Sequence, residues 1–210
     1  MSRPVISVLA GVNGAGKSSI GGYLLSQQGV TWFNPDTFAR ALVQEFGYQQ
    51  EDANAAAWGE GLRRLDLAIA LGKSFAFETT LGGDTITKRL LAACATHDIL
   101  VWFCGLRDAE QHIARVRLRV AQGGHDIPEA RIRQRCLTSV RNLLALMPRL
   151  TELRVYDNSL EVAPGEAIPD PRLVLYLQDG GVLFPATLQD ALGTPDWAKP
   201  LVEAALEDAA

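Results

Sequence analysis

The chain has 210 residues, 48% of them hydrophobic, and a mean hydropathy of +0.05. This apolar content predicts one buried core, so we expect a single domain over 1–210, with its main part over about 1–160 and C-terminal strands and a helix over about 161–210. A formal net charge of −4 excludes a chain-wide basic field for nucleic acid. The apolar stretch 5–10 is too short for a signal-peptide core or a membrane span. We therefore expect a cytoplasmic protein without membrane contact.

The cysteines and two of the tryptophans are expected to be packing residues. Cys94, Cys104 and Cys136 are odd in number and share no C-x-x-C spacing, which predicts reduced thiols rather than a disulfide or metal framework. Trp58 and Trp102 lie in periodic apolar segments and are predicted to be buried.

Apolar runs alternate with helix-period segments from the first residues onward, a pattern typical of βαβ units with a parallel sheet. The expected elements of the first half are a strand over 5–10, a glycine-rich turn, a helix over 18–26, a short strand over 31–33, and helical segments from Pro35 and over 52–71, the last closed by Gly72.

The second half continues the alternation and then changes to hairpin signals. Its expected elements are a strand over 74–77, a helix over 84–95, a strand over 99–103, helices over 109–120 and 128–147, strands over 155–156 and 173–177, a hairpin strand over 182–184, and a helix over 195–206. These elements predict a three-layer α/β/α fold with a mainly parallel sheet and a C-terminal β-hairpin plus helix.

The segment between the first strand and the first helix matches G-x-x-x-x-G-K-[ST], in the context that this phosphate-binding loop requires. Lys17 is expected to span the β- and γ-phosphates of ATP, and Ser18 to ligate Mg²⁺. The remaining predicted nucleotide-binding residues of this segment are Gly11, Asn13, Gly14, Ala15, Gly16 and Ser19. The motif by itself does not distinguish transfer to water from transfer to a substrate.

Polar residues that follow neighbouring strands are candidates for the acceptor side. Asp36 comes directly after the strand over 31–33, where it could take the proton of an acceptor hydroxyl or, alternatively, cap a helix. Glu78, Thr79 and Thr80 follow the next strand, where they could bind a polar substrate or simply cap the strand end. The strand ending at Gly105 has no acid after it, which argues against a motor-type ATPase.

Basic residues gather in the segments 109–120 and 128–147. Arg115 and Arg119 lie four residues apart on one helix face and could close over phosphates, or form a solvated basic face. Spacing does not choose among the further arginines, Arg131, Arg133, Arg135 and Arg141. Asn158, after a short strand, could bind the adenine edge or belong to an Asx turn.

Several of these separated pieces together resemble the zeta toxin family, in its short chromosomal branch. The matching pieces cover about three quarters of the chain and are the phosphate loop, Asn34-Pro35-Asp36, Phe77-Glu78-Thr79-Thr80-Leu81, Arg115 to Arg119, Gly123-Gly124-His125-Asp126-Ile127-Pro128, and Asp157-Asn158-Ser159. The family are P-loop kinases that phosphorylate the 3′-hydroxyl of the sugar in UDP-N-acetylglucosamine.

The resemblance implies that Asp36 is the catalytic base, that Lys17 and Ser18 hold phosphates and Mg²⁺, and that Glu78 helps to bind the sugar nucleotide. It also implies that Arg115 or Arg119 binds phosphate in a lid, and it makes an antitoxin partner plausible. His125 stands near the position of the family's second phosphate-binding arginine, and the long extension of the plasmid-borne toxins is missing.

Three functions remain open at this point. The first is a kinase that phosphorylates a UDP-sugar. The second is an antibiotic or metabolite phosphotransferase on the same fold, and the third is an ATP-binding sensor read by a protein partner.

Overall fold

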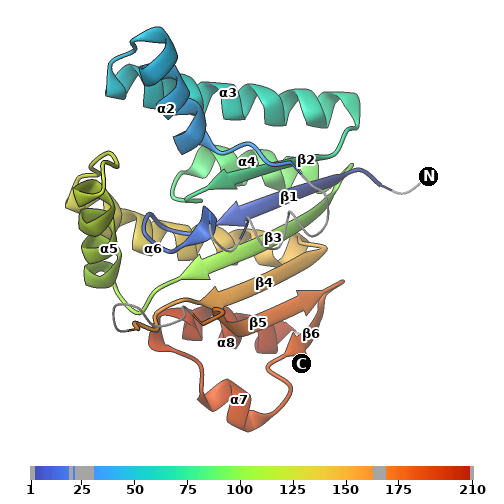
Figure 1. The fold of residues 1–210 in the computed structure, drawn as a ribbon. Coiled ribbons are helices and arrows are strands. Elements are labelled where there is room, and N and C mark those ends of the chain that lie inside the picture. The colour runs from blue at the N-terminus through green and yellow to red at the C-terminus, as the bar shows by residue number, and fades with distance from the viewer. Residues whose placement is uncertain (1–2, 19–20, 22–30, 163–168, 209–210) are drawn as a thin grey trace.

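The computed structural model describes residues 3–18, 21, 31–162 and 169–208, and its centre is a six-stranded sheet in the order β2-β1-β3-β4-β5-β6 (Figure 1). The strands β1 to β4 run parallel, and β5 and β6 are antiparallel to their neighbours. The strand bounds are Val5–Ala10 (β1), Phe75–Thr79 (β2), Asp98–Gly105 (β3), Glu152–Asp157 (β4), Arg172–Gln178 (β5) and Gly181–Phe184 (β6).

The parallel part of the sheet places the carboxyl ends of its strands at one edge. β1 and β3 are almost continuously apolar, because central parallel strands are covered on both faces. Ala10, the last residue of β1, is in register with Thr79 of β2 and Phe103 of β3. The residues that follow these strands therefore meet at a common edge, which is where the candidate site lies.

The antiparallel part is the predicted C-terminal hairpin. Asp179 and Gly180 connect β5 to β6 and both have positive φ angles, 49° and 80°. Two consecutive left-handed residues fit a two-residue turn whose twist matches that of the strands, and an Asp-Gly pair favours it. The predicted mainly parallel sheet with an added hairpin is thus confirmed.

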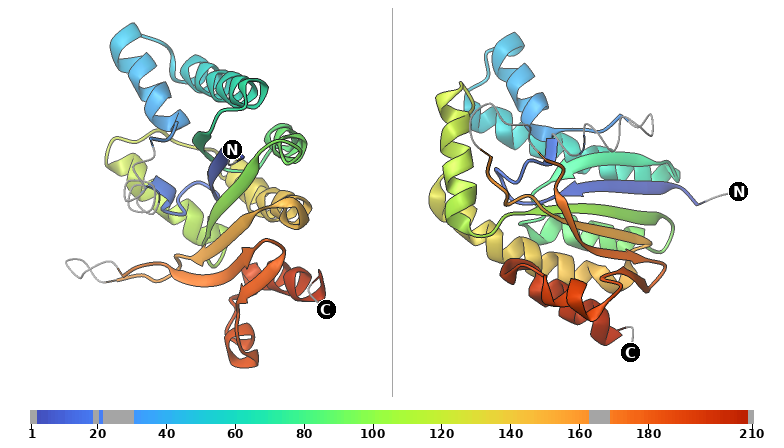
Figure 2. Two further views of the ribbon diagram at one scale, coloured as in Figure 1. Left: turned by 90° about the vertical axis from the view of Figure 1, so that its right-hand side faces the viewer. Right: turned by 60° about the horizontal axis from the view of Figure 1, so that its bottom comes forward.

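Helices lie on one face of the sheet and around two of its edges. Three of them, α4, α6 and α8, cover one face, whereas α2 and α3 lie beyond the β2 edge and α5 lies at the carboxyl ends of the strands (Figures 1 and 2). The bounds are Pro35–Phe46 (α2), Gln50–Leu71 (α3), Asp84–Ala93 (α4), Ala109–Ala121 (α5), Glu129–Leu146 (α6), Leu188–Leu192 (α7) and Lys199–Asp208 (α8). No helix in the described part of the chain is long and apolar enough to cross a membrane.

The main core lies between the sheet and the covering helices. Its sheet residues include Val8, Val101 and Val155, and Leu143 and Leu201 come from α6 and α8. On the other face, Leu9 and Trp102 are buried, with Trp32 packed against them. The helix expected over 18–26 falls largely outside the described residues.

The helical segments expected from Pro35 and over 52–71 are α2 and α3, and α2 ends at Gly47, whose φ is 69°. Two expectations need correction. The strand expected over 31–33 is a single bridge between Phe33 and Phe77, because only Phe33 pairs with the edge of β2. Trp58 is 53% exposed rather than buried, because it faces the pocket described below, whereas Trp102 is buried as predicted. Gly72 closes α3 as expected, with a φ of 60°.

Candidate active site

The phosphate-loop motif follows β1 directly and has the backbone geometry that its glycines predict. Gly14 and Gly16 have φ angles of 84° and 87°, a region that residues with a side chain rarely adopt. A Cβ atom at Gly16 would lie 2.5 Å from Asn158 Nδ2. Both the backbone angle and the close approach therefore require glycine at this position.

The carbonyl oxygen of Ala15 in this loop is held by two side chains, one from β3 and one from the residue that follows β4. Cys104 Sγ donates to it at 3.0 Å and Asn158 Nδ2 at 2.9 Å. Burial raises the pKa of the Cys104 thiol to about 12, so the group stays protonated and remains a donor. Arg115 Nη2 in turn donates to the carbonyl oxygen of Asn158 at 2.8 Å. Arg115 and Asn158 thus support the loop from behind, and neither lines the pocket in front of it.

His112 of α5 fixes the tip of the loop. Its Nδ1 lies 2.8 Å from the carbonyl oxygen of Asn13, and since a carbonyl only accepts, Nδ1 carries the hydrogen. Burial lowers the pKa of His112 to about 4, and the nearby charges of Lys17 and Arg115 act in the same direction. The imidazole is therefore neutral at neutral pH. This residue could not be identified from the sequence, because a single histidine in a helix gives no recognisable signal.

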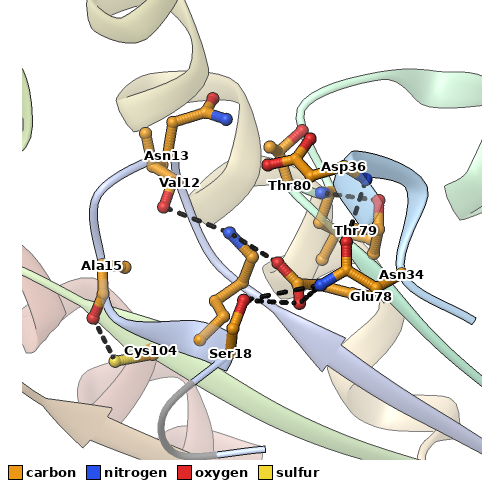
Figure 3. A network of polar contacts seen from close by, with 12 residues as sticks. Val12, Asn13, Ala15, Ser18, Asn34, Asp36, Glu78, Thr79, Thr80 and Cys104 are labelled. Carbon is orange, nitrogen blue, oxygen red and sulfur yellow. Dashed lines mark hydrogen bonds and ion pairs between the residues drawn. The ribbon is translucent and has the colours of Figure 1, made fainter. Parts of the chain in front are cut away.

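Glu78 contacts both functional side chains of the loop (Figure 3). Its Oε1 lies 3.5 Å from Lys17 Nζ, and its Oε2 accepts from Ser18 Oγ at 3.1 Å and from Asn34 Nδ2 at 2.8 Å. The Lys17 and Glu78 side chains are 8% and 9% exposed, so the ion pair is almost fully buried. Glu78 comes to this position from the end of β2, beside β1.

Glu78 and Ser18 lie close enough together to bind one metal ion. Mg²⁺ usually takes one or two carboxylates, a hydroxyl and phosphate oxygens rather than an all-protein cage. The described residues contain no cluster of three His, Cys, Asp or Glu side chains, but Ser18 Oγ and a Glu78 oxygen lie side by side. The residues present fit Mg²⁺ bound together with nucleotide.

Asp36 lies in the first turn of α2, and the N-cap of that helix is Asn34. Asn34 Oδ1 accepts from the main-chain N–H groups of Asp36 and Thr37, so the alternative that Asp36 itself caps the helix is wrong. The Asp36 carboxylate is 41% exposed and faces the pocket. Its Oδ2 lies 3.6 Å from Arg119 Nη1. Arg119 Nε and Nη2 are buried without a hydrogen-bond partner among the described residues.

The turn after β2 is held by α6. Thr79 Oγ1 and Thr80 Oγ1 accept main-chain N–H groups, as strand-capping threonines do. Leu81 has a positive φ of 53°, and Asn142 Nδ2 donates to its carbonyl oxygen at 2.8 Å. Ser139 Oγ donates to the Thr80 carbonyl oxygen at 2.6 Å. These buried polar residues of α6 keep a strained turn in place beside the pocket.

A pocket of about 440 Å³ connects these groups. Of the predicted site residues, the pocket is lined by Asn13, Lys17, Asp36, Glu78, Thr79 and Thr80. Its far wall is partly apolar and comes from α3, with Trp58 and Leu62. The α6 wall is polar and contributes Arg131, Gln134 and Arg135, and His125 lies on the loop before it. Ser19 lies outside the described residues.

Comparisons with known proteins give similarity of structure only. No family model matches the chain, and no curated protein matches it in sequence. Among solved structures, the AvrRxo1-ORF1:-ORF2 complex with ATP has a TM-score of 0.62 at 14% identity, over 92% of this chain and 64% of that chain. The PezAT chromosomal toxin–antitoxin system of Streptococcus pneumoniae has a TM-score of 0.52 at 16% identity, over 75% and 68%.

A putative kinase from Chloroflexus aurantiacus is similar with a TM-score of 0.50 at 18% identity, over 59% of this chain and 70% of that chain. The chain thus spans about two thirds of the length of these proteins. At such identities the likeness concerns the fold alone. The chain therefore has a P-loop kinase-like fold, and its expected resemblance to the zeta toxin family is confirmed as a resemblance of fold.

Proposed function

We propose that this chain is a Mg²⁺- and ATP-dependent kinase that transfers the γ-phosphate to a hydroxyl group of a small molecule. The observation on which this rests is that Lys17, Glu78 and Asp36 line one pocket in front of the phosphate loop. A motor or switch needs no such acceptor cavity, whereas a kinase needs a carboxylate that reaches the acceptor hydroxyl.

In the proposed reaction Asp36 is the general base. The acceptor oxygen forms a bond to the γ-phosphorus while the bond from that phosphorus to the β,γ-bridging oxygen breaks, and the hydroxyl proton passes to the Asp36 carboxylate. Lys17 would bind the β- and γ-phosphates, and Ser18 and Glu78 would hold Mg²⁺. The metal would neutralise part of the phosphate charge.

Arg119 is the proposed lid residue, which would close over the nucleotide phosphates. Its Nη1 pairs with Asp36, whereas its Nε and Nη2 have no hydrogen-bond partner among the described residues. The hydrogen-bonding capacity of the guanidinium is therefore only partly used. Nucleotide phosphates would satisfy it better, and its movement toward them would free Asp36 for the acceptor. Asn158 and Arg115 contribute to nucleotide binding through the main chain of the loop, by the contacts given above.

The first candidate acceptor is UDP-N-acetylglucosamine or a related UDP-sugar, at its 3′-hydroxyl. The pocket supports this choice with a mixed lining, apolar at Trp58 and Leu62 and cationic at Arg131 and Arg135. Glu78, Thr79 and Thr80 would bind the sugar nucleotide from the β2 side. Mass spectrometry of a UDP-sugar mixture incubated with protein and Mg-ATP tests the choice, since one species should gain one phosphate. If instead only a hydroxyl-bearing antibiotic or other metabolite were phosphorylated, the UDP-sugar would be wrong and the kinase retained.

A protein partner of antitoxin type, in the cytoplasm, belongs to the same proposal. AvrRxo1-ORF1:-ORF2 and PezAT are both two-component assemblies by name. Co-expression with the product of an adjacent gene, followed by size-exclusion chromatography, tests whether such a complex forms.

Asp36→Asn is the decisive variant for the chemistry. We expect kcat to fall by at least about 100-fold, because general-base catalysis contributes on that order, while the Kd for ATP stays within about threefold. Asp52→Asn is a matched control, since Asp52 is an exposed acid on α3 that does not line the pocket. Wild-type turnover by Asp36→Asn would contradict the mechanism. An absence of any phosphorylated acceptor in the wild type would instead favour an ATP-binding sensor.

A further inference from the structure

The arginines of α5 and α6 differ in what their guanidinium groups contact. Most have a carboxylate partner, and Arg115 is bonded to main-chain carbonyl oxygens. The ion pairs are Arg117 with Glu129, Arg119 with Asp36, Arg133 with Glu110 and Arg141 with Asp84. Two arginines on the pocket wall, Arg131 and Arg135, form no ion pair within the described part of the chain.

Of these two, Arg135 is the more buried and the more firmly placed. Its Nη1 donates to Asn13 Oδ1 at 2.6 Å, so its one hydrogen-bond partner among the described residues is a neutral amide. Burial lowers the pKa of Arg135, as does the charge of Arg131, and the charge of Asp36 opposes them in part. A desolvated cation without an anion is unfavourable, and binding an anion would remove that cost.

The position of Arg135 identifies which anion it could meet. Asn13 is at the tip of the phosphate loop, and Arg135 lies close enough to Asp36 for their charges to interact. The aliphatic part of the Arg135 side chain packs against Gly82, where an added Cβ atom would lie 2.8 Å from Arg135 Cγ. Arg135 is therefore bonded to the tip of the loop that binds the nucleotide phosphates and lines the same pocket as the proposed base, and a phosphoryl group has to move within that pocket during transfer.

We propose that Arg135 is a catalytic residue of the proposed kinase reaction, one that contacts non-bridging oxygens of the phosphoryl group during its transfer. The inference rests on the proposed function. Arg135 gives up no proton and forms no covalent bond; it stabilises charge on the phosphoryl oxygens while the bonds described above form and break. Because it is already tethered to Asn13, it acts from a fixed position, unlike Arg119, which has to leave Asp36.

The test measures nucleotide binding with and without a mimic of the transferring group, so it needs no acceptor. Titration calorimetry compares ADP with ADP plus aluminium fluoride, both with Mg²⁺. We expect aluminium fluoride to increase the affinity of the wild type for ADP. In Arg135→Gln the affinity for ADP plus aluminium fluoride should be about 100-fold lower than in the wild type, while the affinity for ADP alone stays within about threefold. Arg135→Lys should recover part of the lost affinity, because a lysine is a point charge without the planar fork.

Two further variants separate a catalytic from a structural role. Arg133→Gln is the matched control, two residues away on α6 and paired with Glu110 outside the pocket, and it should behave as the wild type. Asn13→Ala removes the tether. If Arg135→Gln weakened ADP binding as strongly as Asn13→Ala does, with no separate effect on the fluoride complex, Arg135 would only hold the loop and the inference would be overturned.

The outcomes also separate this inference from the proposed function. A variant that loses the fluoride effect while no acceptor is ever found would support the contact between Arg135 and the phosphoryl group, but it would count against transfer of that group to an acceptor. An Arg135→Gln enzyme with wild-type kcat on an identified acceptor would overturn the role of Arg135 and leave the kinase intact.

Discussion

The phosphate loop is buried and held by side chains from other parts of the chain, whereas the pocket in front of it is open and has exposed side chains in its lining. His112, Cys104 and Asn158 all bond to main-chain atoms of the loop. On the pocket side, Asp36 is 41% exposed and Trp58 53% exposed. The difference fits the two proposed tasks. A rigid loop can hold nucleotide phosphates in one position, whereas an open pocket lets an acceptor molecule enter and leave.

Substituting a loop glycine should have the largest effect, on nucleotide binding by the rigid loop. In Gly16→Ala the new methyl group would meet Asn158, and the φ of 87° would be strained by about 1–3 kcal/mol. We expect ATP affinity to fall at least about 100-fold, measured by titration calorimetry. Gly59→Ala is the control, since Gly59 lies in α3 with no atom near its Cβ position, and helix propensity predicts a gain of about 1 kcal/mol in stability. Unchanged ATP affinity in Gly16→Ala would show that the loop adapts.

A substitution on the pocket wall should have a smaller and more selective effect. Trp58→Ala removes an exposed indole from the pocket, so we expect the KM for the acceptor to rise about tenfold, the KM for ATP to stay unchanged, and the melting temperature to change little. Leu67→Ala on the same helix is a matched control, exposed but away from the pocket. If both KM values rose together, the rigid loop and the open pocket would not be separable.

The last expected effect is absent at neutral pH, and it is a pH dependence of stability that comes from the contact of His112 with the loop. The pKa of His112 is lowered from 6.5 to about 4 in the folded protein, so between these values the unfolded chain binds a proton that the folded chain does not. The free energy of unfolding should therefore decrease as pH falls from about 6.5 to 4, by up to about 3 kcal/mol from this group. Above pH 6.5 the group should contribute no pH dependence.

Urea unfolding at a series of pH values measures this effect. His112→Gln, which can still donate to the Asn13 carbonyl, should show a shallower decrease over the same range. Equal slopes in the two proteins would mean that the acid sensitivity comes from other groups.

Much of the fold could be predicted from the sequence, because its signals are local. The apolar runs of β1 and β3, the Asp179-Gly180 turn and the C-cap glycine Gly72 each specify their structure within a few residues. Predictions failed where a tertiary contact decided the outcome: Phe33 pairs with a single residue of β2, and Trp58 is exposed because its side of α3 faces a pocket rather than the core.

In the candidate site, too, some features follow from local sequence and others from tertiary contacts. The phosphate loop can be recognised in the sequence, because its glycines, lysine and serine lie within eight residues and their geometry depends on their own backbone. The positions of Asp36 and Glu78 after neighbouring strands can be predicted in the same way. The packed structure was needed to show that Glu78 contacts Lys17 and Ser18, that Arg115 supports Asn158, and that Arg135 reaches Asn13 across 122 positions of the chain. Side-chain partners so distant in sequence are chosen by how helices pack on the sheet, and no local pattern encodes that packing.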